Sequence, residues 1–380
     1  MNDSTAFSAP PEPSVTNAAA DGRPPAKASQ LWVDPERERA FNTWLAGIAP
    51  THQLIAHTLR EASADAGFRR YLRIDTQDGT SRIIMDAPPA LENCEPFVRI
   101  AALTKKAGLR SPEVLDWNQA DGFILLSDLG NKTLLETLER PDPQIARDFY
   151  VQAVDALISW QLASQPGVLP EYDEPVLREE LESFPDWYIS RHRNLTLSPA
   201  QKAVLDTTFD LIVANNLAAP KVYVHRDFMP RNLMPSASGE PIGVLDFQDA
   251  LYGPITYDIA SLMRDAFLSW DEEFVLDITV RYWERARKVG LMDFEDWSSN
   301  FGSFWRSVEW MGLQRHIKVA GRFARLSLRD SKPKYLADAP RFISYIRHTA
   351  GRYRELTPLL RLVDDIEGSS QASGWAFGRV

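Results

Sequence analysis

The sequence predicts an α+β protein of two lobes, in which a small antiparallel β lobe precedes a larger, mainly helical lobe. Strand-like segments separated by turn residues fill residues 54–85. Apolar residues then recur three and four positions apart over residues 146–162, 200–216 and 260–268, as they do on amphipathic helices. The apolar run Phe123-Ile124-Leu125-Leu126 lies between these regions, and we expect it to connect the two lobes.

Composition marks where ordered structure is expected to begin and end. Residues 1–30 are dense in Ala, Pro and Ser and hold a single aromatic residue, Phe7, so this segment predicts a disordered tail. We expect the nucleotide lobe over residues 31–126 and the catalytic and substrate lobe over residues 127–367. Residues 368–380 predict a loose C-terminal tail.

The first lobe is expected to hold two helices and three antiparallel strands. The first helix is indicated by Phe41, Leu45 and Ile48, which fall at helical spacing. Turn-forming residues separate the apolar and β-branched runs that follow it. The predicted ranges are residues 37–49 for the first helix, 54–61, 68–74 and 81–85 for the strands, and 95–107 for the second helix.

Composition excludes several classes of protein. A chain of 380 residues with 44% hydrophobic residues can fill two cores. The net charge of -10 argues against nucleic acid as a partner, because binding to phosphate backbones relies on an excess of Lys and Arg. A single cysteine, Cys94, excludes an internal disulfide framework. With no signal-peptide pattern and no apolar run of bilayer length, we expect a soluble, cytoplasmic protein whose partners are small molecules.

The most informative pattern lies in residues 222–246. His225-Arg226-Asp227 follows a strand-like run, Asn232 comes five residues after Asp227, and Val244-Leu245-Asp246 ends a second strand-like run. A phosphoryl-transfer loop of the protein-kinase type needs an Asp to accept the hydroxyl proton, an Asn to hold a metal, and a second Asp on the next strand. We therefore predict Asp227 as the catalytic base and Asn232 and Asp246 as ligands of Mg²⁺, which prefers oxygen donors.

Other residues near this pattern are expected to support it or to contact the acceptor. His225 is predicted to be a buried structural residue that bonds the backbone, and Asp258 to cap a helix or hold the catalytic loop. Arg231 is a candidate for substrate binding. Gln248 and Asp249 follow the second Asp directly, so they either reach the acceptor or form a turn.

These residues resemble the aminoglycoside phosphotransferase family, which shares the protein-kinase-like fold. The matching motif is His225-Arg226-Asp227-Phe228-Met229-Pro230-Arg231-Asn232-Leu233-Met234, followed by residues 244–250 and 253–258. Within the family, the chain is most similar to the bacterial kinases that phosphorylate the anomeric hydroxyl of N-acetylmuramate and N-acetylglucosamine in cell-wall recycling. That similarity rests on Phe68-Arg69-Arg70-Tyr71, Met85-Asp86-Ala87-Pro88-Pro89, and Phe323-Ala324-Arg325-Leu326 with Arg329-Asp330.

The resemblance covers about residues 41–362 and implies a two-lobed, protein-kinase-like fold that uses ATP and Mg²⁺. It also implies that the connector offers backbone groups to the adenine edge, which makes Ser127, Asp128 and Leu129 candidates for nucleotide binding. Residues 62–67 occupy the place of a phosphate-covering loop, although they hold only one glycine. A plain hairpin is the alternative for that segment.

The chain departs from the kinase pattern at the third strand. That strand normally carries a Lys that binds the α- and β-phosphates, but Ser81-Arg82-Ile83-Ile84-Met85-Asp86 contains none. Arg70, Arg73 and Arg82 are candidate replacements, because guanidinium binds phosphate in a bidentate manner and stays charged. We expect Arg70 or Arg82 to contact the nucleotide.

Residues 315–334 form a basic stretch in an acidic chain. A solvated helix face is one explanation of such a run. The other is a clamp for a carboxylate, because Arg315, Arg322 and Arg325 recur at helical spacing on one side. N-acetylmuramate carries a lactyl carboxylate and N-acetylglucosamine does not, so these three arginines are candidates for binding the acidic sugar.

Two alternatives remain open at this point. The first is a kinase of the same fold that acts on an aminoglycoside, choline or homoserine. The second is a catalytically silent nucleotide-binding protein, which the missing strand Lys and the glycine-poor loop suggest. The sequence leaves the oligomeric state undetermined.

Overall fold

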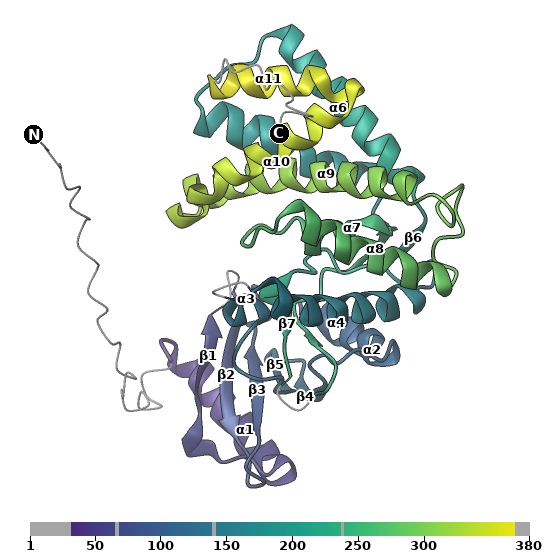
Figure 1. Ribbon diagram of the computed structural model, residues 1–380. Helices are drawn as coiled ribbons and strands as arrows, with labels where there is room; N and C mark the ends of the chain where they lie inside the picture. Colours follow the sequence, from purple (N-terminus) through teal and green to yellow (C-terminus); the bar gives the residue numbers. More distant parts are fainter. Residues whose placement is uncertain (1–31, 65–67, 139–141, 237–238, 369–380) are drawn as a thin grey trace, which may run out of the picture.

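The computed structural model describes residues 32–64, 68–138, 142–236 and 239–368 (Figure 1). The predicted N-terminal tail lies outside these residues, as does the predicted C-terminal tail after Gly368. Residues 65–67, half of the predicted phosphate cover, also lie outside them.

An antiparallel sheet of five strands forms one end of the molecule (Figure 1). Its order is β1-β2-β3-β5-β4, so the strand that was predicted as the connector pairs with β3 and lies inside the sheet. The strands are β1 (Arg60–Ala64), β2 (Arg70–Asp75), β3 (Ser81–Asp86), β4 (Val114–Asn118) and β5 (Phe123–Ser127).

The two faces of this sheet pack against different partners. Side chains alternate between the faces of a strand, so Leu72 and Ile84 join a core with α1 (Pro35–His52). Met85 and Leu126 point the other way and join a core with α2 (Glu95–Lys106). The sheet is therefore buried on both sides. On β2 and β3, even-numbered side chains face α1 and odd-numbered side chains face the opposite side.

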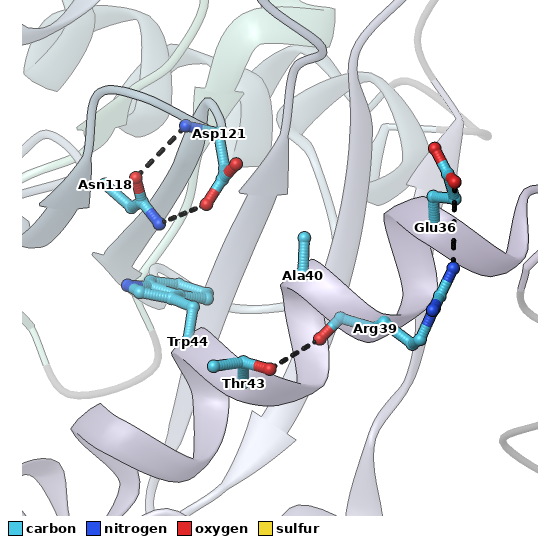
Figure 2. A pocket seen from close by; sticks show the side chains of 7 residues that line it. All are labelled: Glu36, Arg39, Ala40, Thr43, Trp44, Asn118 and Asp121. Carbon is cyan, nitrogen blue, oxygen red and sulfur yellow. Dashed lines mark hydrogen bonds and ion pairs between the residues drawn. The ribbon is translucent and has the colours of Figure 1, made fainter.

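Helix α1 begins after the capping residue Asp34 and covers one face of the sheet. The Asp34 side chain accepts a hydrogen bond from the Glu36 N–H at 2.8 Å, and Phe41 is fully buried against the Phe123 ring, with ring centroids 5.4 Å apart. A shallow hollow of about 420 Å³ opens on the outer side of this helix, between Trp44 and the turn at Asp121 (Figure 2).

Gly122 shapes the turn between β4 and β5. Its φ is +71°, and a Cβ atom there would lie 2.0 Å from the Ala87 carbonyl oxygen. Its own carbonyl accepts a hydrogen bond from the Ala87 N–H. Glycine is required here by both the left-handed conformation and the close approach.

The rest of the chain is mainly helical and surrounds the long helix α9, which crosses the middle of the large lobe (Figure 1). This helix packs against α5, α7, α10 and the π-helical segment Phe184–His192. The helices are α3 (Leu134–Thr137), α4 (Pro143–Leu162), α5 (Glu174–Ser183), α6 (Pro199–Ala218), α7 (Thr256–Met263), α8 (Glu272–Lys288), α9 (Phe301–Leu328), α10 (Ala339–Arg352) and α11 (Thr357–Glu367).

Two short strand pairs lie between the sheet and these helices. Strands β6 (Lys221–Val224) and β9 (Leu251–Pro254) pair antiparallel, and so do β7 (Leu233–Met234) and β8 (Gly243–Val244). The loop that contains Asp227 runs from β6 to β7. The two pairs therefore position the predicted catalytic loop.

The predicted α+β class, with an antiparallel first lobe and a mainly helical second lobe, is confirmed. Two predicted elements differ in detail, and one strand of the sheet was not predicted. The strand over 54–61 is wrong, because residues 56–58 form a 3₁₀ turn and β1 starts at Arg60. The helix over 260–268 is wrong beyond Met263, because the Asp265 carboxylate accepts hydrogen bonds from the Ala266 and Leu268 N–H groups and turns the chain. Strand β4 was not predicted, since its side chains are all half-buried and do not alternate.

No helix among the described residues is both long enough and apolar enough to span a bilayer.

The contact between α1 and the sheet can be tested by truncating its central ring. Phe41→Ala should lower the free energy of unfolding by about 3–5 kcal/mol, because it removes a fully buried aromatic side chain. Phe68→Ala is the matched control, since Phe68 is 64% exposed. Urea denaturation of both variants measures the difference, and equal midpoints would show that α1 does not stabilise the sheet.

Candidate active site

The predicted base and metal ligands lie on two adjacent loops joined by the side chain of Asn232. The Asn232 amide nitrogen donates to the Asp227 carbonyl oxygen at 2.9 Å and to Asp246 Oδ2 at 3.3 Å. Gln248 Nε2 donates to the other oxygen of Asp246 at 2.8 Å. The three residues picked out by sequence spacing are thus brought together.

The loops hold two residues in strained backbone conformations. Arg226 has φ +76° and Asp246 has φ +64°, in the left-handed region that residues with a Cβ rarely adopt. Each such residue costs about 1–2 kcal/mol and persists only where its surroundings hold it. Strain of this kind clusters at functional sites, and here it occurs beside the base and at the predicted metal carboxylate.

His225 and Asp258 supply part of the restraint. The buried His225 ring donates from Nε2 to the Leu245 carbonyl oxygen at 2.9 Å, while its Nδ1 accepts from the Asp227 N–H at 3.3 Å. The Asp258 carboxylate accepts from the His225 N–H at 2.7 Å and the Arg226 N–H at 3.0 Å. These contacts are those that the predicted structural roles of both residues require.

Nearby cations keep Asp227 ionised. Burial alone would raise the pKa of the Asp227 carboxyl, but the charges of Lys318 and Arg315, followed by His225 and Arg226, lower it below its usual value. Burial has the opposite result at Asp258, where it raises the pKa to about 6. Asp227 is therefore the stronger acid of this pair and is a carboxylate near neutral pH.

A cavity of about 370 Å³ opens in front of these residues. It is lined by the connector and the catalytic loops together, including Ser127 and Leu129 from the first and Asn232, Asp246 and Gln248 from the second. A site of this shape, with a few polar groups converging at one end, is typical of a small-molecule cleft.

The residues present fit a hard divalent cation. The Asn232 amide lies within 3.3 Å of the Asp246 carboxylate, so the two side chains are close enough to share one ion. Asp246 is exposed and lines the same cavity as Asn232. An amide oxygen and a carboxylate are the donors that Mg²⁺ prefers.

Two predicted nucleotide ligands lie elsewhere. Arg70 points to the α1 side of the sheet, where it pairs with Asp86 at 2.9 Å and lies over the Trp32 ring. Arg82 donates to Thr80 Oγ1 and lines a separate, more open hollow of about 910 Å³. Neither lines the cleft itself, because strand alternation turns even-numbered residues toward the other face, although the hollow beside Arg82 adjoins the cleft and shares Arg73, Asp128 and Leu129 with it. That they bind the nucleotide stays a prediction.

The third candidate, Arg73, does line the cleft but is already bound. Its Nε donates to Asp128 Oδ2 at 2.6 Å and its Nη2 to the Gly130 carbonyl oxygen at 2.7 Å. Although burial opposes it, the Arg73 contact lowers the pKa of Asp128. Asp128 therefore braces the connector through its side chain, and Ser127, Asp128 and Leu129 all line the cavity.

The basic residues of α9 divide into buried and accessible ones. Arg315 is 3% exposed and donates to the Arg226 carbonyl oxygen at 2.8 Å, so its predicted contact with the sugar does not fit its position. The Arg322 side chain is 39% exposed, and Arg325 is half-buried. Arg231 is exposed, lines the cavity and lies over the Phe267 ring. Asp249 is exposed and is not among the residues that line the cavity.

Sequence reasoning missed two buried residues beside the catalytic loop. Glu180 on α5 pairs with Arg226 at 2.9 Å, and Lys318 on α9 pairs with Glu180 at 2.7 Å. Glu180 lies in a run of acidic residues, and Lys318 was one of several cations in the basic stretch. Their spacing carried no signal that separated them from solvent-exposed neighbours.

The chain belongs to the phosphotransferase enzyme family, whose model matches residues 58–294. It is therefore an enzyme that transfers a phosphoryl group.

Proteins of similar sequence from two bacteria share one name. A protein named N-acetylmuramate/N-acetylglucosamine kinase from Neisseria meningitidis serogroup B is 43% identical over 344 residues, which cover 90% of this chain and 100% of the relative. A protein of the same name from Pseudomonas aeruginosa is 43% identical over 346 residues, which cover 89% of this chain and 99% of the relative. The resemblance seen in the sequence motifs is confirmed.

Solved structures share the fold at low sequence identity. An ethanolamine kinase from Plasmodium vivax is 11% identical, with a TM-score of 0.57 over 88% of this chain and 93% of that one. A macrolide 2'-phosphotransferase from Brachybacterium faecium is 16% identical, with a TM-score of 0.54 over 79% of this chain and 98% of that one. The predicted two-lobed, kinase-like fold is confirmed.

The role of Asp227 is tested by removing its charge and little else. Asp227→Asn should lower kcat by about 10²–10⁴-fold, the usual contribution of a positioned general base, with little change in nucleotide affinity. Steady-state kinetics and nucleotide titration measure the two quantities. Asp293→Asn, the same change at an exposed carboxylate in the loop after α8, is the control. Normal turnover of Asp227→Asn would remove this residue from the mechanism.

Proposed function

We propose that this enzyme transfers the γ-phosphoryl group of ATP to the anomeric hydroxyl of N-acetylmuramate and N-acetylglucosamine, giving the 1-phosphates used in recycling cell-wall sugars. The observation that carries this proposal is the full-length similarity to relatives of that name, at 43% identity. Asn232 and Asp246 line one cavity, and Asn232 bonds the backbone of Asp227 directly behind them, so the three groups together supply the chemistry. Because ATP is the donor, we place the reaction in the cytoplasm.

The mechanism follows from the positions of the charged groups. Asp227 accepts a hydrogen bond from the acceptor hydroxyl, orients it toward the phosphoryl group and takes its proton as the bond forms. An anomeric hydroxyl is more acidic than an ordinary alcohol, so orientation is the larger part of this work. Asn232 and Asp246 would hold Mg²⁺, which neutralises charge on the phosphate oxygens when bound.

The nucleotide is expected to lie along the connector. Ser127, Asp128 and Leu129 line the cavity. The Ser127 N–H already donates to the Glu113 carbonyl and the Leu129 carbonyl accepts from Arg110, so the other backbone groups of the connector are proposed to bond the adenine edge. Asp128 and Arg73 keep the connector rigid. We therefore propose residues 31–126 as the nucleotide lobe and residues 127–367 as the catalytic and substrate lobe. Arg70, Arg73 and Arg82 remain the candidates to replace the strand Lys. Arg231 is the other basic residue that lines the cavity in the described part of the chain, and we assign it to substrate phosphate or sugar.

The lactyl carboxylate of N-acetylmuramate is assigned to Arg322 and Arg325. Arg322 lies 3.9 Å from Glu180 Oε1, the same oxygen that binds Arg226, so this part of α9 is close to the catalytic loop. Burial and the neighbouring charges of Arg322 and Arg329 lower the pKa of Arg325. An anion bound between these like charges would relieve their repulsion.

Product analysis tests the reaction directly. Incubation with ATP, Mg²⁺ and N-acetylmuramate should give a phosphorus NMR signal that couples to the anomeric proton, because the 1-hydroxyl is the acceptor. N-acetylglucosamine should behave in the same way. Aminoglycoside, choline and homoserine run in parallel should give no product, and phosphorylation of one of these in place of the sugars would replace the proposed acceptor.

The carboxylate assignment makes a separate prediction about selectivity. Arg322→Ala and Arg325→Ala should each raise KM for N-acetylmuramate by about tenfold, as expected for loss of a charge-assisted bond of about 1.4 kcal/mol, while KM for N-acetylglucosamine stays within about twofold. Arg329→Ala is the control at the same helix end, because Arg329 is 56% exposed and already pairs with Asp330. Equal changes for both sugars would show that these arginines do not read the carboxylate.

A further inference from the structure

A buried carboxylate lies behind the catalytic loop and binds the loop's arginine. Glu180 is 2% exposed, and its Oε1 accepts from Arg226 Nη2 at 2.9 Å and from Lys318 Nζ at 2.7 Å. Its Oε2 accepts from the Tyr172 hydroxyl at 2.5 Å. Burial alone would raise the pKa of Glu180, but Lys318 and Arg226 lower it to about 2. The carboxylate is thus ionised and fully engaged.

Arg226 is held at each of its polar ends by a different helix. Its N–H donates to Asp258 on α7 and its carbonyl accepts from Arg315 on α9. Its guanidinium donates to Glu180 on α5. Because Arg226 has φ +76° and is the residue directly before Asp227, these three contacts decide the direction in which the Asp227 side chain leaves the backbone.

Lys318 keeps Glu180 in place. It is 5% exposed, and its ammonium group donates to the Tyr257 hydroxyl at 2.8 Å as well as to Glu180. Arg322 also lies near Glu180, but at 3.9 Å, so Lys318 is the close second cation that fixes the orientation of the carboxylate. Lys318 does not line the cavity and lies behind the catalytic loop.

The approach of α5 to α9 that makes this pair possible depends on Gly321. A Cβ atom at Gly321 would lie 2.3 Å from the Ser183 carbonyl carbon and oxygen at the end of α5. The Ser183 hydroxyl in turn donates to the Lys318 carbonyl oxygen at 3.3 Å. The two helices are therefore in backbone contact one turn away from the Glu180–Lys318 pair.

We propose that Glu180 and Lys318 are positioning residues for phosphoryl transfer: the buried pair holds Arg226 in its left-handed conformation and so directs Asp227 at the acceptor hydroxyl. The inference rests on the reaction proposed above, in which Asp227 orients that hydroxyl. Neither residue lines the cavity: Glu180 acts through Arg226, and Lys318 acts through Glu180 and also places its charge near Asp227. Losing the pair should therefore lower kcat and leave the binding of ATP and of N-acetylglucosamine unchanged.

Lys318→Met tests the pair by removing the charge while keeping most of the side-chain volume. It should lower kcat by about 10–100-fold, the scale on which misplacing a reacting group acts, while KM for ATP and for N-acetylglucosamine, which lacks the carboxylate assigned to Arg322, stays within about twofold. Lys318→Arg, which restores the cation, should recover most of the loss. Thermal unfolding of each variant reports stability separately, and a purely structural role would change stability without this split between kcat and KM.

Lys202→Met is the matched control, because Lys202 forms an exposed pair with Asp206 on α6 at 3.2 Å. It should leave all kinetic constants unchanged. A double-mutant cycle with Glu180→Gln adds a further test, since two residues that act as one unit should give a combined loss close to the larger single loss. Full additivity would mean that they act independently and would overturn the proposal.

Two measurements keep the test decisive if Lys318→Met is unstable or the acceptor proves different. Tyr257→Phe keeps every charge and removes only the hydroxyl that binds Lys318; it should lower kcat about threefold with both KM values unchanged. Hydrogen exchange of residues 222–232 needs no substrate and should speed up in Lys318→Met or, failing that, in Tyr257→Phe. If the wild-type enzyme were inactive with both sugars, only the proposed acceptor would be wrong. If hydrogen exchange and kcat were unchanged in these variants, the positioning role of Glu180 and Lys318 would be wrong.

Discussion

The left-handed backbone of Arg226 is the constraint on which the rest of the active site depends. A residue with a long side chain keeps this conformation only when its surroundings hold it. Asp258, Arg315 and Glu180 do so from three separate helices, one at each polar end of the residue. The packing of the large lobe therefore sets the direction of the Asp227 carboxylate. A shift of any of these three helices would move Arg226 and, with it, Asp227.

This arrangement places charge inside an acidic protein. The chain has a net charge of -10, yet its buried cations Arg315 and Lys318 gather behind the catalytic loop. They offset the buried carboxylates and lower the pKa of Asp227. Arg315, Lys318, Arg322 and Arg325 all lie on α9. Its buried Arg315 and Lys318 support the catalytic loop, and its accessible Arg322 and Arg325 are proposed to select the sugar.

In the small lobe, the alternation of side chains along each strand decides which residues reach the cleft. Side chains on β2 and β3 alternate between the α1 face and the cleft, so Arg73 lines the cleft while Arg70 and Arg82 do not. Arg73 is then bound by Asp128, which fixes the connector. The charge that a kinase usually places on its third strand is thus absent from the cleft side of this strand, where the apolar Met85 packs against α2.

The sequence by itself determined the class of fold, the catalytic loop and the residues Asp227, Asn232 and Asp246. It could do so because strand and helix periods are local, and because loop chemistry requires particular side chains at short, fixed separations. It did not determine which arginines face the cleft, since that depends on strand register, nor the roles of Glu180 and Lys318. Glu180 meets Arg226 across 46 positions of the chain, and Lys318 meets Glu180 across 138. Only the packing of α5 against α9 at Gly321 brings them together, because helix contacts of this kind leave no spacing in the sequence.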